Sequence, residues 1–460
     1  MSKEESVKTE NKMGTMPVNK LLITMGVPLM ISMLVQACYN IVDSVFVARL
    51  SEDALTAVSM AFPVQSVMIA LGTGMGVGMN AMLSKSLGEG DRENASCAAN
   101  NGIFLGICFY LVFILVGLFV VWPFYMSQIS QNMDIVHYGV SYTRICCLFS
   151  LGAFLQIIVE RMIQGTGHTI YTMVTQLTGA ITNLILDPIL IFGLGPAPKM
   201  GVAGAAIATC VGQWFAAALA IVLNHKYNRE IQVTLAQVFH PNWGVIKRIA
   251  YVGIPSTIMA SIGSVMYYGM NLILTGFSST ASAVFGVYFK LQSFFFMPVF
   301  GMNNAIVPVV AYNYGAGKRS RMIQTLKTGM IFGMVIMAVG TLVFELFPET
   351  LLNFFNASEH MKSIGVPALR IIAVHFPIAA ACIVLGTMFQ SLGRAVFSAI
   401  ISVGRQLVVL LPVAYVLARV GGLSVIWWCF PIAELMSLTL TIIFFTKIYR
   451  DVVMKVPDRV

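Results

Sequence analysis

Two aspartates interrupt stretches of the sequence that are otherwise apolar enough to cross a membrane. Asp43 lies within "YNIVDSVFVARL" (residues 39–50), and Asp187 lies within "ITNLILDPIL" (residues 181–190). A carboxylate inside the hydrocarbon core costs about 2.5–3.5 kcal/mol on insertion scales, so an acid at this depth usually has a functional partner. Asn183 precedes Asp187 by one helical turn, and a rise of about 1.5 Å per residue places Thr209 of the next apolar segment at a similar depth.

These four side chains could together hold a monovalent cation. Two carboxylates, an amide and a hydroxyl at one level supply oxygen ligands for Na+ or can share a proton. Because two like charges cannot both ionise cheaply in a low dielectric, the acids should hold one proton or one cation between them. The alternative is that both acids are structural and are satisfied by neighbouring donors. Inside a membrane the functional interpretation is favoured. The predicted coupling site for H+ or Na+ therefore consists of Asp43, Asn183, Asp187 and Thr209.

A polar face leads toward this site along the first apolar segment. Its residues recur at three- and four-residue spacings, which places them on one side of a helix: Ser32, Gln36, Tyr39 or Asn40, and Asp43. We expect part of this face to line a substrate cavity in the first half of the chain. The predicted cavity residues are Gln36, Tyr39, Asn40, Tyr142, Glu160 and Gln176. Glu160 would attract a cationic compound there, although an ion pair with the neighbouring Arg161 is the plainer interpretation.

Four ionisable residues within apolar segments of the second half are candidates for a switch: Lys290, His375, Arg405 and Glu434. Lys290 would act as a switch charge or simply pair with Glu434, and Arg405 is a second candidate partner for the same acid. His375 suits proton coupling because histidine titrates near neutral pH. A buried, hydrogen-bonded histidine is the alternative.

The composition is that of a polytopic membrane protein. Of 460 residues 58% are hydrophobic and only 10% are charged, and the mean hydropathy is +0.83. A span needs about 20 apolar residues, and the polar breaks divide the chain into twelve such segments. They lie near 21–47, 54–82, 98–122, 137–163, 169–192, 201–223, 246–274, 281–312, 325–347, 364–390, 395–418 and 422–446. The predicted fold is an all-α bundle of twelve transmembrane helices.

Lysine and arginine gather in the connections expected on one side, whereas those on the other side offer only Arg49, Lys199, Lys362 and Arg419. This bias places both termini in the cytoplasm. It also accounts for the net charge of +9 without a nucleic-acid partner, because the basic residues are scattered. The polar first 20 residues show no cleavable signal peptide. We expect cytoplasmic tails at 1–20 and 447–460.

An internal repeat organises the remainder of the chain. A shift of 227 positions brings Gly26-Val27-Pro28 onto Gly253-Ile254-Pro255, Gly74 onto Gly301 and Gly88 onto Gly315. Each half then holds six spans, which predicts two parallel lobes, 21–223 and 246–446, related by a pseudo-two-fold axis along the membrane normal and joined by a cytoplasmic linker at 224–245. The repeat does not extend to the acids, because Asp43 corresponds to Met270 and Asp187 to Leu411. The predicted coupling site is therefore confined to the first lobe.

The sequence resembles the multidrug and toxic compound extrusion (MATE) family of secondary transporters over essentially its whole length. The resemblance is carried by Gly26-x-Pro28, "NIVDSVFVARL" (40–50), "QGTGH" (164–168), "LDPILIFGLG" (186–195) with "GVAGAAIAT" (201–209), and "YGAGK" (314–318). It implies a V-shaped pair of lobes that alternates between outward-open and inward-open states. It also implies a coupling site on the positions that match Asp43, Asn183, Asp187 and Thr209, and a bend of the first helix near Pro28 on protonation. Family members that couple through the second lobe have acids in spans 7 and 10, where this chain has none.

The sequence thus predicts a secondary active antiporter, not an enzyme, that exports amphiphilic or cationic organic compounds in exchange for H+ or Na+. The alternative is a lipid-linked oligosaccharide flippase of the same superfamily, which should line its cavity with more basic residues than the few inside these spans. A channel is disfavoured because the polar face is confined to one lobe. We expect no cofactor, no metal except Na+ at the coupling site, membrane lipid and small molecules as partners, and a monomer in the plasma membrane of a prokaryote.

Overall fold

The computed structural model describes residues 11–129, 132–195, 198–355 and 357–459, without the side chains of Asn40, Ile41 and Ile129. Within these ranges the chain is helical, and the one β-bridge joins Lys318 to Asp458. Ten helices are long and apolar enough to cross a membrane, and two further spans are bent helix pairs. The prediction of an all-α bundle with twelve spans is confirmed.

The first lobe contains six of these spans. They are α2 (Val18–Ala48), α3 (Glu52–Gly88), α4 (Arg92–Leu115) continued by α5 (Val121–Ile129), α6 (Met133–Leu148) with α7 (Leu151–Gly165), α8 (Thr169–Phe192) and α9 (Val202–Tyr227). A short helix, α1 (Lys12–Thr15), precedes them, and α10 (Leu235–Val238) follows them in the connection to the second lobe. That connection is shorter than the predicted linker, because α9 extends to Tyr227 and α11 begins at Trp243.

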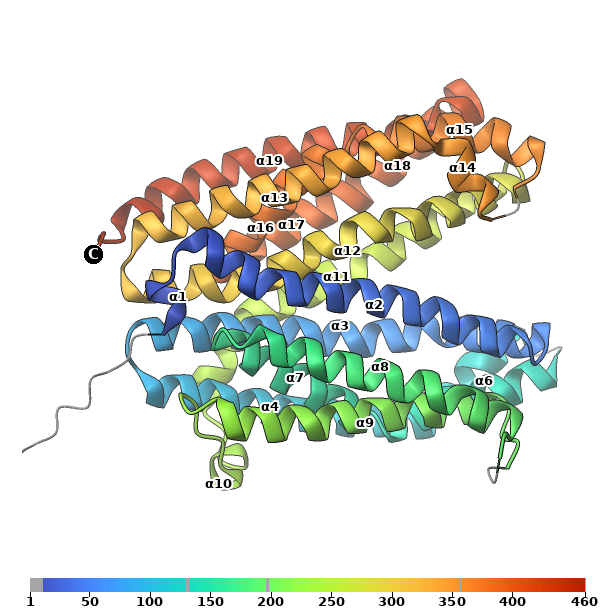
Figure 1. Ribbon diagram of the computed structural model, residues 1–460. Helices are drawn as coiled ribbons and strands as arrows, with labels where there is room; N and C mark the ends of the chain where they lie inside the picture. The colour runs from blue at the N-terminus through green and yellow to red at the C-terminus, as the bar shows by residue number, and fades with distance from the viewer. Residues whose placement is uncertain (1–10, 130–131, 196–197, 356, 460) are drawn as a thin grey trace, which may run out of the picture.

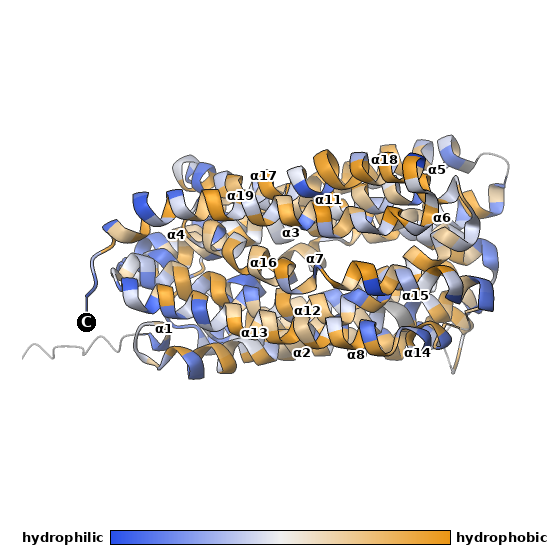
Figure 2. Ribbon diagram, turned by 90° about the horizontal axis from the view of Figure 1, so that it is seen from above, coloured by the Kyte–Doolittle hydropathy of each residue, from blue (hydrophilic) through white to orange (hydrophobic). Residues whose placement is uncertain are grey.

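The second lobe repeats this arrangement. Its spans are α11 (Trp243–Thr275), α12 (Ser279–Ala316), α13 (Arg319–Leu346), α15 (Glu359–Ala373) with α16 (Phe376–Ser391), α17 (Ala395–Val403) continued by α18 (Leu411–Gly421), and α19 (Cys429–Asp451), with the short α14 (Pro348–Asn353) after α13. The two bent pairs are equivalent in the repeat, and they bend by similar angles, 48° for α6–α7 and 45° for α15–α16. Hydrophobic residues predominate along the middle of the helices, and hydrophilic residues are more frequent at both ends (Figure 2).

The two lobes meet at one end of the molecule and separate toward the other (Figure 1). We call the end that carries α1 and the end of α19 the terminal end, and the opposite end, where α2 joins α3, the far end. Glycines permit the contact. A side-chain carbon on Gly74 would collide with Thr257 of α11, and one on Gly78 would overlap the carbonyl oxygen of Ile249. Close packing through small residues is typical of helix contacts in membranes.

The residues that precede α2 bind both lobes at the terminal end. The Nη2 atom of Arg321 donates hydrogen bonds to the carbonyl oxygens of Met13 (3.0 Å) and Met16 (2.7 Å). On the other side, the Nδ2 atom of Asn11 donates to the carbonyl oxygen of Thr166 (3.1 Å) and to Glu230 Oε2 (2.8 Å). We call residues 11–16 the N-terminal strap. The expected tail at 1–20 therefore includes an ordered segment that ties the lobes together.

Candidate functional site

The predicted coupling residues come together in the first lobe. From α8, the Nδ2 atom of Asn183 donates to Asp187 Oδ1 (3.3 Å), one turn later, and to Thr209 Oγ1 of α9 (3.2 Å). Asp187 is fully buried, and Asn183 and Thr209 are nearly so. The carboxyl group of Asp43, from α2, lies within hydrogen-bonding reach of the carboxyl group of Asp187. Three helices thus bring two acids, an amide and a hydroxyl to one place.

The site has more acceptors than donors. Asp43 Oδ1, Asn183 Oδ1 and Asp187 Oδ2 are buried and have no hydrogen-bond partner among the described residues. Buried polar atoms without partners are costly. Oxygen atoms of this kind are the ligands that a proton or a hard monovalent cation needs, and Asn183 cannot satisfy them because its amide hydrogens already point at Asp187 and Thr209. The residues present therefore fit a bound H+ or Na+.

Two tyrosines lie next to the acids. Tyr39 is close to both Asp43 and Asp187. The hydroxyl group of Tyr142 accepts a hydrogen bond from Gln65 Nε2 (3.3 Å). Tyr142 is buried in the apolar packing around the far end of the lobe and is not among the residues that line the first-lobe cavity, so its role as a cavity residue stays a prediction.

A cavity of about 180 Å³ runs through the first lobe beside the coupling site. Gln36, Tyr39, Glu160 and Gln176 line it as predicted, together with Asn183 and Thr209 of the coupling site. The side chain of Asn40, which was predicted with them, lies outside the described residues. The cavity and the coupling site therefore share one wall, which allows occupancy of one to affect the other.

Glu160 is a buried acid held by neutral donors. Its Oε1 atom accepts hydrogen bonds from Thr175 Oγ1 (2.8 Å) and Gln156 Nε2 (3.1 Å), and its Oε2 atom accepts one from Gln176 Nε2 (2.8 Å). The expected ion pair with Arg161 is wrong. These donors are neutral, and the guanidinium of Arg161, which also lines the cavity, forms no ion pair with Glu160 but partly offsets its negative charge toward a cation there.

Arg161 instead connects the two lobes. Its Nη1 atom donates to Gln164 Oε1 of the same helix (3.1 Å) and to Asn304 Oδ1 of α12 (2.9 Å). Its side chain passes over Gly76 of α3, where a side-chain carbon would collide with it. This cross-lobe hydrogen bond lies on the terminal side of the first-lobe cavity.

The second lobe holds a larger cavity, of about 490 Å³, that the sequence did not predict. Its apolar wall is formed by flexible and aromatic side chains: Met259, Met266, Phe289, Phe296, Met297 and Phe300. Polar positions interrupt this wall at Gln292, Asn303, Gln390 and Gln406. Thr73 and Asn304 line both cavities, so the two spaces meet at the lobe interface. The repeat could have indicated part of this wall, because Gln390 is the equivalent of Gln164, which lines the first-lobe cavity.

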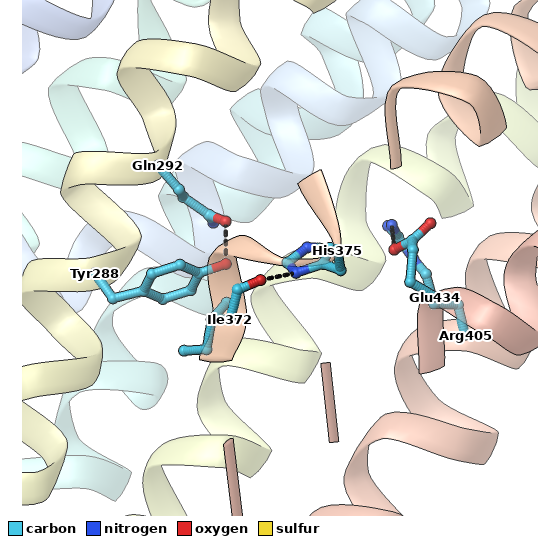
Figure 3. A network of polar contacts seen from close by, with 6 residues as sticks. All are labelled: Tyr288, Gln292, Ile372, His375, Arg405 and Glu434. Atoms are coloured by element: carbon cyan, nitrogen blue, oxygen red, sulfur yellow. Dashed lines mark hydrogen bonds and ion pairs between the residues drawn. The ribbon is translucent and has the colours of Figure 1, made fainter. Parts of the chain in front are cut away.

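An ion pair crosses the wall of this second cavity (Figure 3). Arg405 Nη1 lies 3.0 Å from Glu434 Oε2, so Arg405 and not Lys290 is the partner of Glu434. Lys290 is exposed and does not line the cavity. His375 is buried at the bend between α15 and α16, and its Nδ1 atom bonds to the carbonyl oxygen of Ile372. Nearby, Tyr288 donates its hydroxyl hydrogen to Gln292 Oε1 (2.6 Å).

Twelve spans in two lobes of equivalent fold, with cavities that meet between the lobes, define a membrane transporter. The MatE family model matches residues 28–189 and 255–416, two segments of equal length at the spacing of the internal repeat. The chain therefore belongs to the MatE family, whose members are membrane transporters and not enzymes.

Individual relatives agree with this assignment. The multidrug export protein MepA of Staphylococcus aureus is 26% identical over 428 residues, which cover 91% of both chains. The FAD transporter of Shewanella oneidensis is 23% identical, covering 91% of this chain and 92% of its own. The crystal structure of a MATE transporter in complex with MaL6 superimposes with a TM-score of 0.89 at 23% identity, over 95% of this chain and 98% of that one. A multidrug resistance MATE transporter in an outward-facing conformation gives 0.88 at 23% identity, with 96% and 98% covered.

Proposed function

We propose that this transporter exports amphiphilic, often cationic, organic compounds in exchange for H+ or Na+. The observation that carries the proposal is the group of unpartnered buried oxygens on Asp43, Asn183 and Asp187, beside a cavity that holds the buried acid Glu160. The name of the relative MepA, a multidrug export protein, supports export as the direction.

The basic residues support a cytoplasmic position for the terminal end, because Lys and Arg gather in the connections there. The lobes touch at that end and separate toward the far end, so the cavities of this state face outward. A cation that enters from outside neutralises the Asp43–Asp187 pair. Neutralisation removes the repulsion between the acids and lets α2, which runs unbroken through Pro28, repack or bend against the cavity and expel the compound.

The energy available is sufficient for substantial export. One positive charge that moves inward down a potential of 100 mV supplies about 2.3 kcal/mol. For an uncharged compound exchanged one for one, this corresponds to a concentration ratio of about forty-fold, since 1.4 kcal/mol is about tenfold. For a compound with one positive charge the exchange is electroneutral, and the concentration gradient of the coupling ion supplies the energy.

The flippase alternative is less well supported. A cavity for a pyrophosphate-linked sugar needs several free cations, whereas Arg405 is paired with Glu434 and Arg161 is bonded to two side-chain amides. The large second cavity is instead lined by methionine and phenylalanine, which tolerate many ligand shapes.

Transport in inside-out vesicles tests the proposal. A fluorescent organic cation is offered while a pH gradient and a Na+ gradient are imposed separately. We expect accumulation with one gradient and not with the other, which identifies the coupling ion. Equal transport with neither gradient present would contradict the antiport.

A further inference from the structure

The connection between the lobes, residues 228–242, and the first turn of α11 present large apolar side chains to the surroundings. Leu235 is 77% exposed, Phe239 62% and Trp243 66%. Exposed apolar residues on a segment outside the spans need an explanation, because a connection in water would hide them or replace them with polar residues.

These side chains are held outward by a folded segment. Asn100 Oδ1 accepts a hydrogen bond from the backbone nitrogen of Thr234 (3.1 Å), and Asn100 Nδ2 donates to the carbonyl oxygen of Gln232 (3.0 Å) and to Gln237 Oε1 (2.8 Å). The next residue, Asn101, accepts from the backbone nitrogen of Asn242 through Oδ1 (2.9 Å).

Apolar anchors complete the attachment. Ile231 and Val238 of the connection are buried against the lobe. Within α10 the side chain of Val238 is buried, whereas Leu235, Ala236 and Gln237 are exposed, so the segment is attached to the lobe through few apolar contacts and leaves most of its surface uncovered.

The position of α10 brings its exposed side chains to the level at which the spans end. The segment joins the ends of two spans, α9 and α11, and α10 projects sideways from the first lobe alongside the end of α9 (Figure 1). At the ends of membrane spans, where the hydrocarbon gives way to the lipid headgroups, tryptophan and other large apolar residues are enriched.

The flanking residues carry a consistent charge. His225, Lys226, Arg229, Lys247 and Arg248 are exposed at the two ends of the connection. Glu230 is the one acid between residues 225 and 248, and its carboxylate already accepts a hydrogen bond from Asn11. Each exposed Lys or Arg near an anionic leaflet contributes about 1 kcal/mol of attraction.

We propose that the connection between the lobes is an in-plane membrane anchor that binds the headgroups of anionic phospholipids. Leu235, Phe239 and Trp243 enter the boundary of the leaflet at the terminal end, and Lys226, Arg229, Lys247 and Arg248 bind the phosphates. The hydrogen bonds of Asn100 and Asn101 connect the anchor to α4. The anchor therefore fixes the first lobe relative to the leaflet. The inference depends on the membrane-spanning fold and not on the transported compound.

Tryptophan fluorescence of the full chain in nanodiscs tests the insertion. The discs contain phosphatidylcholine and phosphatidylglycerol, with bromine on the acyl chains of one or the other. The signal of Trp243 is the difference between the wild type and Trp243→Phe. We expect bromine to quench this difference signal, and more strongly when phosphatidylglycerol carries it. No quenching from either lipid would place Trp243 in water or under a protein partner, and would overturn the proposal.

Paired charge variants test the headgroup binding. The affinity of the protein for phosphatidylglycerol in mixed micelles is measured through the fluorescence of Trp243. Lys247→Gln with Arg248→Gln should weaken this affinity by about five-fold for each charge removed. Lys447→Gln with Arg450→Gln removes the same charge from exposed positions at the same end of the second lobe and should leave that affinity unchanged. Equal weakening by both pairs would mean that only the net charge matters, which would contradict a site on the connection.

Discussion

Gly88 of α3 and Gly315 of α12 make the same contact in opposite directions. A side-chain carbon on Gly88 would overlap the carbonyl oxygen of Tyr312, and one on Gly315 would overlap the carbonyl oxygen of Lys85. Gly88 thus faces the residue three positions before Gly315, and Gly315 faces the residue three positions before Gly88. Because the two glycines are equivalent in the repeat, the interface is symmetric about the axis between the lobes.

Gly88→Ala should therefore open the terminal end. The added carbon has no room against backbone, so the lobes must separate there. Spin labels on exposed positions 93 and 324, in a cysteine-free background, should report a longer distance in this variant than in the wild type. Gly333→Ala is the matched control, since its added carbon would meet Ala380 at an ordinary 3.6 Å. An unchanged distance in Gly88→Ala would show that the contact does not hold the lobes.

Because Arg405 and Glu434 form an ion pair, substitutions of the two residues should have strongly non-additive effects on stability. Arg405→Met alone leaves the buried carboxylate of Glu434 without its partner, at a cost of about 3–5 kcal/mol. Glu434→Leu alone leaves a partly exposed guanidinium in the cavity wall, at a smaller cost. The double variant removes both charges and should lose much less stability than the sum of the two losses. Thermal unfolding in detergent measures all three. Additive losses would mean that the two charges do not interact.

Glu160→Gln should reduce the affinity for cationic compounds selectively. The substitution removes the negative charge from the first-lobe cavity while keeping the size of the side chain. We expect binding of an organic cation to weaken about tenfold, which corresponds to 1.4 kcal/mol, and binding of a neutral compound of similar size to change little. A binding titration with both compounds checks this. Equal weakening of both would assign Glu160 to the packing of the cavity.

The folded protein should lose stability in acid because of His168. It lies at the terminal end near the N-terminal strap, and burial together with the Lys12 ammonium lowers its pKa below the ordinary value of 6.5. The unfolded chain therefore binds a proton more readily than the folded chain. The stabilisation is complete above pH 6.5 and is lost as the pH falls toward the lower folded pKa.

Thermal unfolding at pH 7.5 and 5.5 (about one unit on either side of the histidine reference value) checks this effect. We expect His168→Gln to show a smaller drop than the wild type. His225→Gln, at an exposed position of the same end, should show the full drop. Identical drops in all three proteins would assign the pH dependence to other groups.

The spans, the repeat and the coupling residues follow from local sequence properties. Apolar length defines the helices, and acids within apolar helices stand out because burial in lipid is costly. The cavities could not be located in the same way. Tyr142 and Tyr39 have the same chemistry, and only the packing of α6 against α3 and α9 decides that one is buried and the other lines a cavity.

Partner choice also depends on the tertiary structure. Glu434 had two candidate cations, and the path of α17 and α18 beside α19 brings Arg405 to it. Arg161 follows Glu160 directly in sequence, yet consecutive residues of a helix point in different directions. Its partner, Asn304, lies in the other lobe and carries no signal in the sequence that would identify it.

The most direct test of the account compares driven transport with passive exchange in the acid variants. Asp43→Asn and Asp187→Asn are reconstituted beside Asp134→Asn, an exposed acid in the first turn of α6. We predict that both site variants lose accumulation driven by the H+ or Na+ gradient and still exchange labelled compound across the membrane, whereas Asp134→Asn keeps both activities. Gradient-driven accumulation at the wild-type rate in either site variant would contradict the assignment of the Asp43–Asp187 pair as the coupling site.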